Sequence, residues 1–287
     1  MGMKGFKGFE KDFSCGGKQC EENTTYEEYG EGCCYKGVMH FYEDPWEVLN
    51  HYDLVDGNGN LSEFAEVEAL GQVWNDGEKR ATNKIHVGAK LGLKGFLKAC
   101  IDFTLEKTKY ESNGTNLSGN SAQIGSSGDY AQIGSSGYSA QIGSSGDSAQ
   151  IGSSGYSAQI GSSGDSAKIG SSGDSAKIGS SGDSAKIGSS GDCAQIGSSG
   201  DSAQIGSSGD YAQINSTGED AVIMCAGRKS KAKGKKGSWI TLAEWVKDEE
   251  KGRYVPICVK TERVDGEKIK EDTYYTLKNG EFSEVEE

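Results

Sequence analysis

The stretch Gly128-Asp129-Tyr130-Ala131-Gln132-Ile133-Gly134-Ser135-Ser136 is one copy of a nine-residue phrase that fills residues 119–226. The phrase occurs twelve times without an insertion, with Ile at one fixed slot and Ala two residues before it. The slot is occupied by Ile124, Ile133, Ile142, Ile151, Ile160, Ile169, Ile178, Ile187, Ile196, Ile205, Ile214 and Ile223. A short fixed period of this kind predicts a solenoid, in which each repeat packs only against its neighbours.

Each phrase predicts a strand followed by a turn. Within Ser-Ala-Gln-Ile-Gly, Ala and Ile alternate with polar residues, so a strand directs both apolar groups inward and Gln or Lys outward. Ser-Ser-Gly-Asp is typical of a turn, in which we expect Gly to supply a positive φ. Nine residues are too few to close around a core, so we expect eighteen residues per coil and six coils. Tyr138 and Tyr156 lie eighteen residues apart in the aspartate slot and are expected to stack in successive coils.

Acidic residues dominate the array. It contains ten Asp or Glu and three Lys, in a chain of 287 residues with a net charge of −13. This charge disfavours direct binding to nucleic acid and favours a basic partner. No apolar run approaches the roughly 18 residues of a membrane span, and residues 1–6 lack the apolar stretch of a secretory signal. We therefore expect no membrane contact and reduced thiols in a cytosol.

The chain is predicted to be mainly β and to have three parts. Residues 1–118 form an α+β cap domain, residues 119–226 the parallel β-solenoid, and residues 227–287 a basic linker and a small antiparallel β-meander cap. Solenoid ends expose apolar groups and unpaired strand edges, so both flanking regions are expected to act as caps. In the first part, strands are predicted at 4–9, 35–41, 64–73 and 84–90. Helices are predicted from the N-cap Asp44 and over 95–107.

The C-terminal part begins with six Lys or Arg among the small residues of 227–237. This composition predicts a flexible, solvated linker or hairpin tip. Beyond it, the aromatic and β-branched runs at 239–246, 254–264 and 273–277 predict an antiparallel meander. We expect its apolar face, with Trp239, Trp245 and Ile257, to close the last coil.

The candidate binding residues are aspartates that recur once per coil and so form a row along one edge of the solenoid. This row consists of Asp129, Asp147, Asp165, Asp183 and Asp201, continued by Glu219. A shorter row on the other edge consists of Asp174, Asp192 and Asp210. Carboxylates about 5 Å apart repel one another unless they are screened or paired. The rows are either solvated turns or a surface that holds basic groups.

Metal binding is not predicted. Calcium rolls follow G-G-x-G-x-D-x-U-x, whereas here the aspartate lies one place earlier. Cys15, Cys20, Cys33 and Cys34 could suggest zinc, but two adjacent cysteines are awkward ligands for one tetrahedral ion. The loop at 56–60 begins like a calcium hand but lacks Gly at its sixth and Glu at its twelfth position. We expect no metal and no cofactor.

The N-terminal part resembles an uncharacterised domain found in phage and prophage proteins. The likeness rests on Tyr35-Lys36-Gly37-Val38-Met39-His40 with Asp44-Pro45, and on the stretch Phe64-Ala65-Glu66-Val67-Glu68-Ala69-Leu70-Gly71. The tail, with Gly237-Ser238-Trp239 and Val264-Asp265-Gly266-Glu267-Lys268-Ile269-Lys270, is similar to the ends of other phage-encoded repeat proteins. The resemblance implies a phage or prophage origin and no defined activity.

A fainter resemblance, from Lys36-Gly37 to Glu66-Val67-Glu68-Ala69-Leu70-Gly71, is to the scaffold of ADP-ribosyltransferases. Those enzymes place Arg or His on the first strand, where this chain offers Lys4 and Lys7. No catalytic set is therefore carried over. The groups to examine for catalysis are Glu63, Glu66, His40 and Tyr35.

These patterns favour a non-catalytic interaction protein that presents a rigid acidic rod to a basic host protein, such as a nucleic-acid-binding or defence protein. We expect it in the cytoplasm of a bacterial host cell or associated with a virion. One alternative is a structural virion or assembly component that self-associates through the edge with Tyr138 and Tyr156. The other is an ADP-ribosyltransferase-like enzyme in the N-terminal domain.

Overall fold

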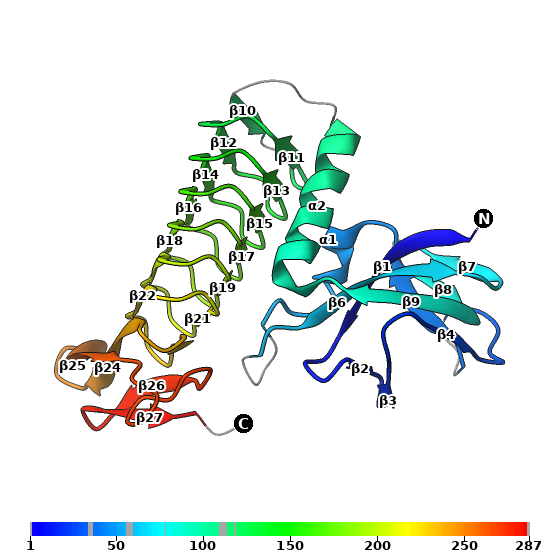
Figure 1. Ribbon diagram of the computed structural model, residues 1–287. Coiled ribbons are helices and arrows are strands. Elements are labelled where there is room, and N and C mark those ends of the chain that lie inside the picture. The colour runs from blue at the N-terminus through cyan, green and yellow to red at the C-terminus, as the bar shows by residue number, and fades with distance from the viewer. Residues whose placement is uncertain are drawn as a thin grey trace. The chain divides into compact units, whose positions relative to one another are not determined.

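The computed structural model describes residues 2–33, 37–55, 60–77, 79–117 without 109–113, and 119–285 (Figure 1). It divides into two compact units, one of residues Met1–Phe103 and one of residues Thr104–Glu287. The division lies within α2, before the start of the parallel sheets. Each unit is described by itself below.

The N-terminal unit is built on an antiparallel sheet. Its strand order is β4 (Thr24–Glu27), β9 (Lys84–Lys90), β6 (Glu63–Ala69), β1 (Met3–Phe9), β5 (Met39–Tyr42), β8 (Lys79–Thr82) and β7 (Val73–Asp76). A separate hairpin consists of β2 (Ser14–Cys15) and β3 (Lys18–Gln19). The described residues of this unit include the helix α1 (Pro45–Val48) and most of α2 (Gly92–Thr108), whose residues from Thr104 belong to the second unit. The predicted strand at 64–73 is split into β6 and β7, while the part of the predicted strand 35–41 that includes Tyr35 lies outside the described residues.

Strand alternation gives this sheet an apolar cluster on each face. On one face, Phe64 stacks on Phe96 of α2 with ring centroids 3.8 Å apart, and Trp46 of α1 joins them. The other face carries Phe9, Phe41 and their neighbours. The predicted N-cap of α1 is confirmed, because the Asp44 carboxylate accepts a hydrogen bond from the Trp46 backbone amide at 2.9 Å.

The C-terminal unit is a parallel β-solenoid of about 18 residues per turn, as predicted, and of about seven turns rather than six. One sheet contains β10 (Gly114–Leu117), β12 (Gln132–Ser135), β14 (Gln150–Ser153), β16 (Lys168–Ser171), β18 (Lys186–Ser189), β20 (Gln204–Ser207) and β22 (Val222–Cys225). The other contains β11 (Gln123–Ser126), β13 (Gln141–Ser144), β15 (Gln159–Ser162), β17 (Lys177–Ser180), β19 (Gln195–Ser198), β21 (Gln213–Ser216) and β23 (Lys231–Lys233). Each residue pairs with the one eighteen positions on, as Ile151 does with Ile169.

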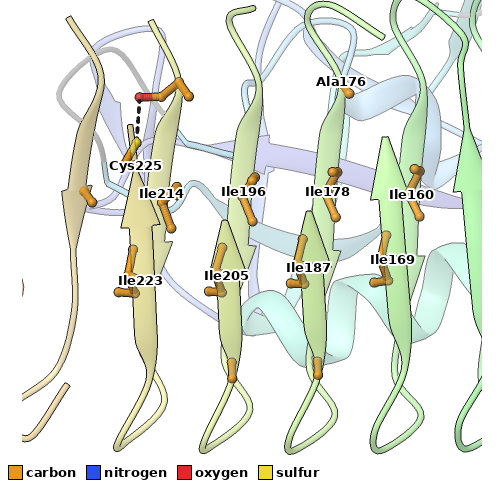
Figure 2. Packing of buried hydrophobic residues seen from close by; sticks show 14 of the residues in the cluster. Ile160, Ile169, Ala176, Ile178, Ile187, Ile196, Ile205, Ile214, Ile223 and Cys225 are labelled. Atoms are coloured by element: carbon orange, nitrogen blue, oxygen red, sulfur yellow. Dashed lines mark hydrogen bonds between the residues drawn. The ribbon is translucent and has the colours of Figure 1, made fainter. Parts of the chain in front are cut away.

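The core of the solenoid consists of stacked isoleucines and alanines, as predicted. Figure 2 shows two rows of isoleucines, one per sheet, with Ile160 and Ile178 in one and Ile169 and Ile187 in the other. Ile169 is 3% exposed and Ala176 is fully buried. The first serine after the strand glycine also points inward, although the repeat pattern predicts only Ala and Ile there. The hydroxyl of Ser153, for example, accepts a hydrogen bond from the Gly155 amide at 3.3 Å.

The expected role of the turn glycines in the array is wrong. In the turns that carry Asp, the positive φ belongs to the residue after Asp, such as Ser148 and Ser166, both with φ of 56°. The turn glycines are required because stacked backbones approach closely there. A Cβ atom on Gly164 would lie 2.1 Å from the Gly146 carbonyl oxygen, which no side chain can tolerate.

The last turn of the solenoid is formed by residues predicted to be a linker. β23 pairs in parallel with β21, and Ala232 takes the inward slot opposite Ile214. The lysines of this segment are held by neighbours: Lys235 forms an ion pair with Asp272, with Nζ and Oδ2 2.7 Å apart, and Lys233 lies over the Tyr274 ring. The prediction of a flexible linker is therefore wrong.

The C-terminal cap continues both sheets. β24 (Trp239–Asp248) pairs in parallel with β22 and in antiparallel fashion with β25 (Arg253–Arg263). β26 (Tyr275–Lys278) joins β23 and β27 (Glu281–Glu284).

The apolar face that closes the last turn is not the predicted one. The buried cap residues are Ile240, Leu242, Val264, Ile269, Tyr275 and Leu277. Trp239 and Ile257, which were expected to cover the core, are 48% and 56% exposed. The register explains this, because Ile240 pairs with the inward Ile223 and so turns Trp239 outward. Within the described residues, no helix is both long and apolar enough to cross a membrane.

Candidate interaction surface

The five predicted aspartates and Glu219 lie in the turns that lead from the sheet of β11 to the sheet of β12. We call this row the acidic edge: Asp129, Asp147, Asp165, Asp183, Asp201 and Glu219. All six side chains are exposed. Neighbouring members lie one turn apart, about 4.8 Å along the solenoid, so the row extends over about 24 Å.

Each carboxylate of the aspartates on the acidic edge is fixed by the next turn. The backbone amide of Asp147 donates to Oδ1 of Asp129 at 3.0 Å, and that of Asp165 donates to Oδ1 of Asp147 at 2.9 Å. The same bond recurs through Asp201, whose Oδ1 accepts from the Glu219 amide at 2.8 Å. The sequence predicted the row but not these bonds. A short carboxylate is therefore a structural acceptor as well as a charge.

The αL residue after each aspartate completes this arrangement. The amide of Ser148 donates to the Asp165 carbonyl oxygen at 2.8 Å, and the amide of Ser166 donates to that of Asp183 at 2.8 Å. Successive turns are thus joined by both main-chain and side-chain bonds. Within the described part of the chain, none of the five aspartates forms an ion pair, so their negative charges are uncompensated by a nearby cation.

The opposite edge of the solenoid is mixed in charge. Asp174 and Asp192 are exposed and linked by the same amide bond, 2.8 Å long. Asp210 instead accepts bonds from Arg228, whose backbone amide and Nε lie 2.7 and 2.6 Å from its two carboxylate oxygens. Burial opposes ionisation of Asp210, but the hydrogen bonds and charge of Arg228 lower its pKa below the usual 3.8. This row therefore ends in a compensated pair.

Tyr138 and Tyr156 belong to this second edge, and the stacking expected from their spacing is confirmed. Their ring centroids are 5.2 Å apart with an interplanar angle of 11°. The turns that carry them differ from the aspartate turns, because the Ser157 amide bonds back to the Tyr138 carbonyl oxygen in the preceding turn. A tyrosine cannot offer the carboxylate acceptor, so ring stacking replaces the amide ladder.

Two of the residues considered for catalysis, Glu66 and His40, line different hollows. Glu66 lines a hollow of about 420 Å³ with Lys4, Glu68 and His86. His40 lines a separate cavity of about 260 Å³, and its Nε2 lies 2.6 Å from the Cys33 carbonyl oxygen. Burial lowers the pKa of His40. Glu63 lines neither hollow, and Tyr35 lies outside the described residues.

The cysteines also fail to form a metal centre among the described residues. Cys15 contacts the Tyr52 hydroxyl, with Sγ and the oxygen 3.0 Å apart, and Cys20 is buried. Burial and the neighbouring Cys15 raise the pKa of the Cys20 thiol, although Lys7 and Lys18 oppose them. Cys34 and most of the loop at 56–60 lie outside the described residues. No group of three His, Cys, Asp or Glu ligands occurs in the described part of the chain.

The chain is therefore mainly β and consists of an antiparallel-sheet unit and a capped parallel β-solenoid. Residues 3–99 match the family described as Domain of unknown function (DUF7666), which covers the sheet of the N-terminal unit. Neither a curated protein nor a solved structure matches the chain.

Proposed function

We propose that the chain is a non-catalytic interaction protein whose acidic edge binds a basic protein. The observation that carries this proposal is the row of six exposed acidic side chains on one edge of the solenoid, with no Lys or Arg in the same slot. Its five aspartates have Oδ1 fixed by the next turn. A fixed carboxylate loses little side-chain entropy on binding. Its ion pair with a partner is therefore more favourable than the same pair formed by a flexible side chain.

The charge spacing supports a partner that ordinarily binds nucleic acid. The acidic edge carries about one negative charge per 4.8 Å, compared with one per about 3.4 Å along a DNA strand. Screening limits its field to about 8 Å at physiological salt, so the partner must be in contact with the edge. The resemblance to phage-encoded proteins supports a phage or prophage setting, in which a host defence or nucleic-acid-binding protein is the partner class.

A column carrying the protein tests this proposal. We expect the column to retain a basic host protein at low salt and to release that protein between about 0.2 and 0.5 M salt. Competing DNA should displace the host protein from the column. Changing Asp129, Asp147, Asp165 and Asp183 together to Asn should abolish capture. The fold should persist, because the amide oxygen of Asn can accept the same bond from the next turn.

A charge-matched control separates the edge from net charge. Glu249, Glu250, Glu267 and Glu271 are exposed on the C-terminal cap, so changing them to Gln removes four negative charges elsewhere on the unit. Capture should survive in this variant. If both variants capture the partner as well as the original chain, the acidic edge is only a solvated row of turns.

Self-association through Tyr138 and Tyr156 is a second candidate function. The two stacked rings are 56% and 46% exposed and together form an aromatic patch on this edge. Changing both to Asp installs the residue found at this slot in Asp174 and Asp192. Analytical ultracentrifugation should then show a loss of any oligomer, whereas an unchanged distribution of species would exclude this edge as the contact.

A further inference from the structure

A cavity on the C-terminal cap is lined mostly by residues that are not needed to cover the apolar end of the solenoid. It has a volume of about 270 Å³ and lies among the last turns of the second edge, β24, β25 and β26. Its lining includes the acidic Glu244 together with the aromatic and cationic residues Tyr211, Arg228, Lys229, Trp245, Tyr254 and Lys278. Aromatic rings and cations thus gather in a unit whose repeats are otherwise acidic.

Three of these residues occupy turn slots that hold Asp or Ser in earlier turns of the second edge. Arg228 occupies the slot that holds Asp in Asp192 and Asp210, while Tyr211 and Lys229 occupy the next slot, which holds Ser in Ser175. Their backbone follows the repeat nonetheless, because Tyr211 and Lys229 have φ of 58° and 53°, as Ser175 has 58°. The fold therefore does not require these side chains, and all three line one cavity.

The walls of the cavity are held rigidly. Arg228 is fixed by Asp210 and lies 4.1 Å from the centre of the Tyr254 ring. The Trp245 indole donates to the Ala226 carbonyl oxygen at 2.8 Å. Both carboxylate oxygens of Glu244 accept backbone amides, from Asn279 and Gly280, each at 2.8 Å. A site that is already ordered loses little entropy when a ligand binds.

The charge left over in the cavity is positive. Arg228 is paired with Asp210. Glu244, whose oxygens accept two backbone amides, keeps one negative charge against the two positive charges of Lys229 and Lys278. Lys229 lies over the Tyr211 ring at 5.4 Å. Within the described residues, neither Lys229 nor Lys278 forms an ion pair with a carboxylate. An ammonium group beside an aromatic ring and a second lysine in the same lining suit a ligand that combines an anionic group with a planar ring.

We propose that this cavity binds a mononucleotide-like ligand, in which a planar ring stacks on Tyr211 or Tyr254 and a phosphate contacts Lys229 and Lys278. Its volume lies just below the roughly 300–1,000 Å³ of common small-molecule sites, which limits the ligand to a small molecule. Stacking of a base on an aromatic side chain and contact of lysine with phosphate are both general modes of nucleotide recognition.

Isothermal titration calorimetry of the full chain with AMP, adenosine and inorganic phosphate tests the proposal. We expect AMP to bind at least tenfold more tightly than either adenosine, which lacks the charge, or phosphate, which lacks the ring. Tyr211→Ser and Lys229→Ser restore the residue found at this slot elsewhere in the array, so both variants should fold. Tyr211→Ser should weaken AMP binding at least fivefold, the lower end of the effect of removing one stacking ring. Lys229→Ser should weaken AMP binding and leave adenosine binding unchanged, because it removes a contact to the phosphate alone.

Tyr130→Ser is the matched control, because Tyr130 occupies the same slot with φ of 58° but lies in the first turns of the array and is 73% exposed. It should leave AMP binding unchanged. The proposal is overturned if AMP does not bind at millimolar concentration. It is equally overturned if phosphate alone binds as tightly as AMP, or if Tyr130→Ser weakens AMP binding as much as Tyr211→Ser does.

Discussion

Replacing Ile169 with Asp should disrupt the solenoid near its middle. Ile169 is 3% exposed and pairs with Ile151 on one side and Ile187 on the other. The change removes an isoleucine burial of about 1.5–3 kcal/mol and places an unpartnered carboxyl group in an apolar row, at a cost of several kcal/mol more. Because a typical domain is stable by only about 5–15 kcal/mol, the turns around β16 should open.

The neighbouring Lys168 supplies the control. It is exposed on the outer face of the same strand, so Lys168→Asp should change stability by no more than about 0.5 kcal/mol. Ile169→Val, which keeps the apolar row, should cost about 0.5–1.5 kcal/mol. Hydrogen exchange of peptides from β14, β16 and β18, together with thermal melts, measures these effects. Equal losses for the Asp variants at 168 and 169 would refute the assignment of the inward face.

Three further predictions concern the turns and metal dependence. Gly164→Ala should destabilise the chain strongly, because its Cβ would lie 2.1 Å from the Gly146 carbonyl oxygen. Gly170→Ala meets open space and should be neutral or slightly stabilising. Chemical unfolding compares the two variants, and equal losses of stability would contradict the requirement for close backbone approach at Gly164. Asp165→Ala should cost about 0.5–1.5 kcal/mol, because the exposed Asp183 amide exchanges its carboxylate acceptor for water. Asp165→Asn should cost less than half as much, and similar losses in both variants would show that charge, not the hydrogen bond, matters. A chelator should leave the melting temperature unchanged, and a fall of more than about 5 °C would reveal a structural metal.

The repeating part of the fold was predictable because a fixed period determines both pairing and face. The inward positions of Ile and Ala and the stacking of Tyr138 on Tyr156 follow directly from it. The ends of the solenoid were not predictable in the same way. β10 and β23 do not contain the repeat phrase and join the two sheets through backbone hydrogen bonds to β12 and β21. Backbone pairing of this kind depends little on side chains, so the sequence does not reveal it.

The errors have physical causes that a sequence does not display. A glycine needed for a positive φ and one needed for close backbone approach look the same, so the role of Gly164 was misread. The outward orientation of Trp239 depends on the register with β22, which is set by Ile240 meeting Ile223. In the candidate site, the row of aspartates was predictable from spacing, whereas their bonds to next-turn amides required the geometry of the turn.

The most direct test of the proposed function is the affinity of the chain for a defined lysine-rich peptide at about 0.1 M salt, with three proteins compared. They are the original chain, the variant with Asn at 129, 147, 165 and 183, and the control with Gln at 249, 250, 267 and 271. Exposed ion pairs contribute about 0.2–1 kcal/mol each, so the loss of four at the acidic edge should weaken binding by between about fourfold and about 900-fold. The control should bind as the original chain does. Equal weakening in both variants would mean that net charge alone attracts the peptide, and the acidic edge would then not be the binding surface.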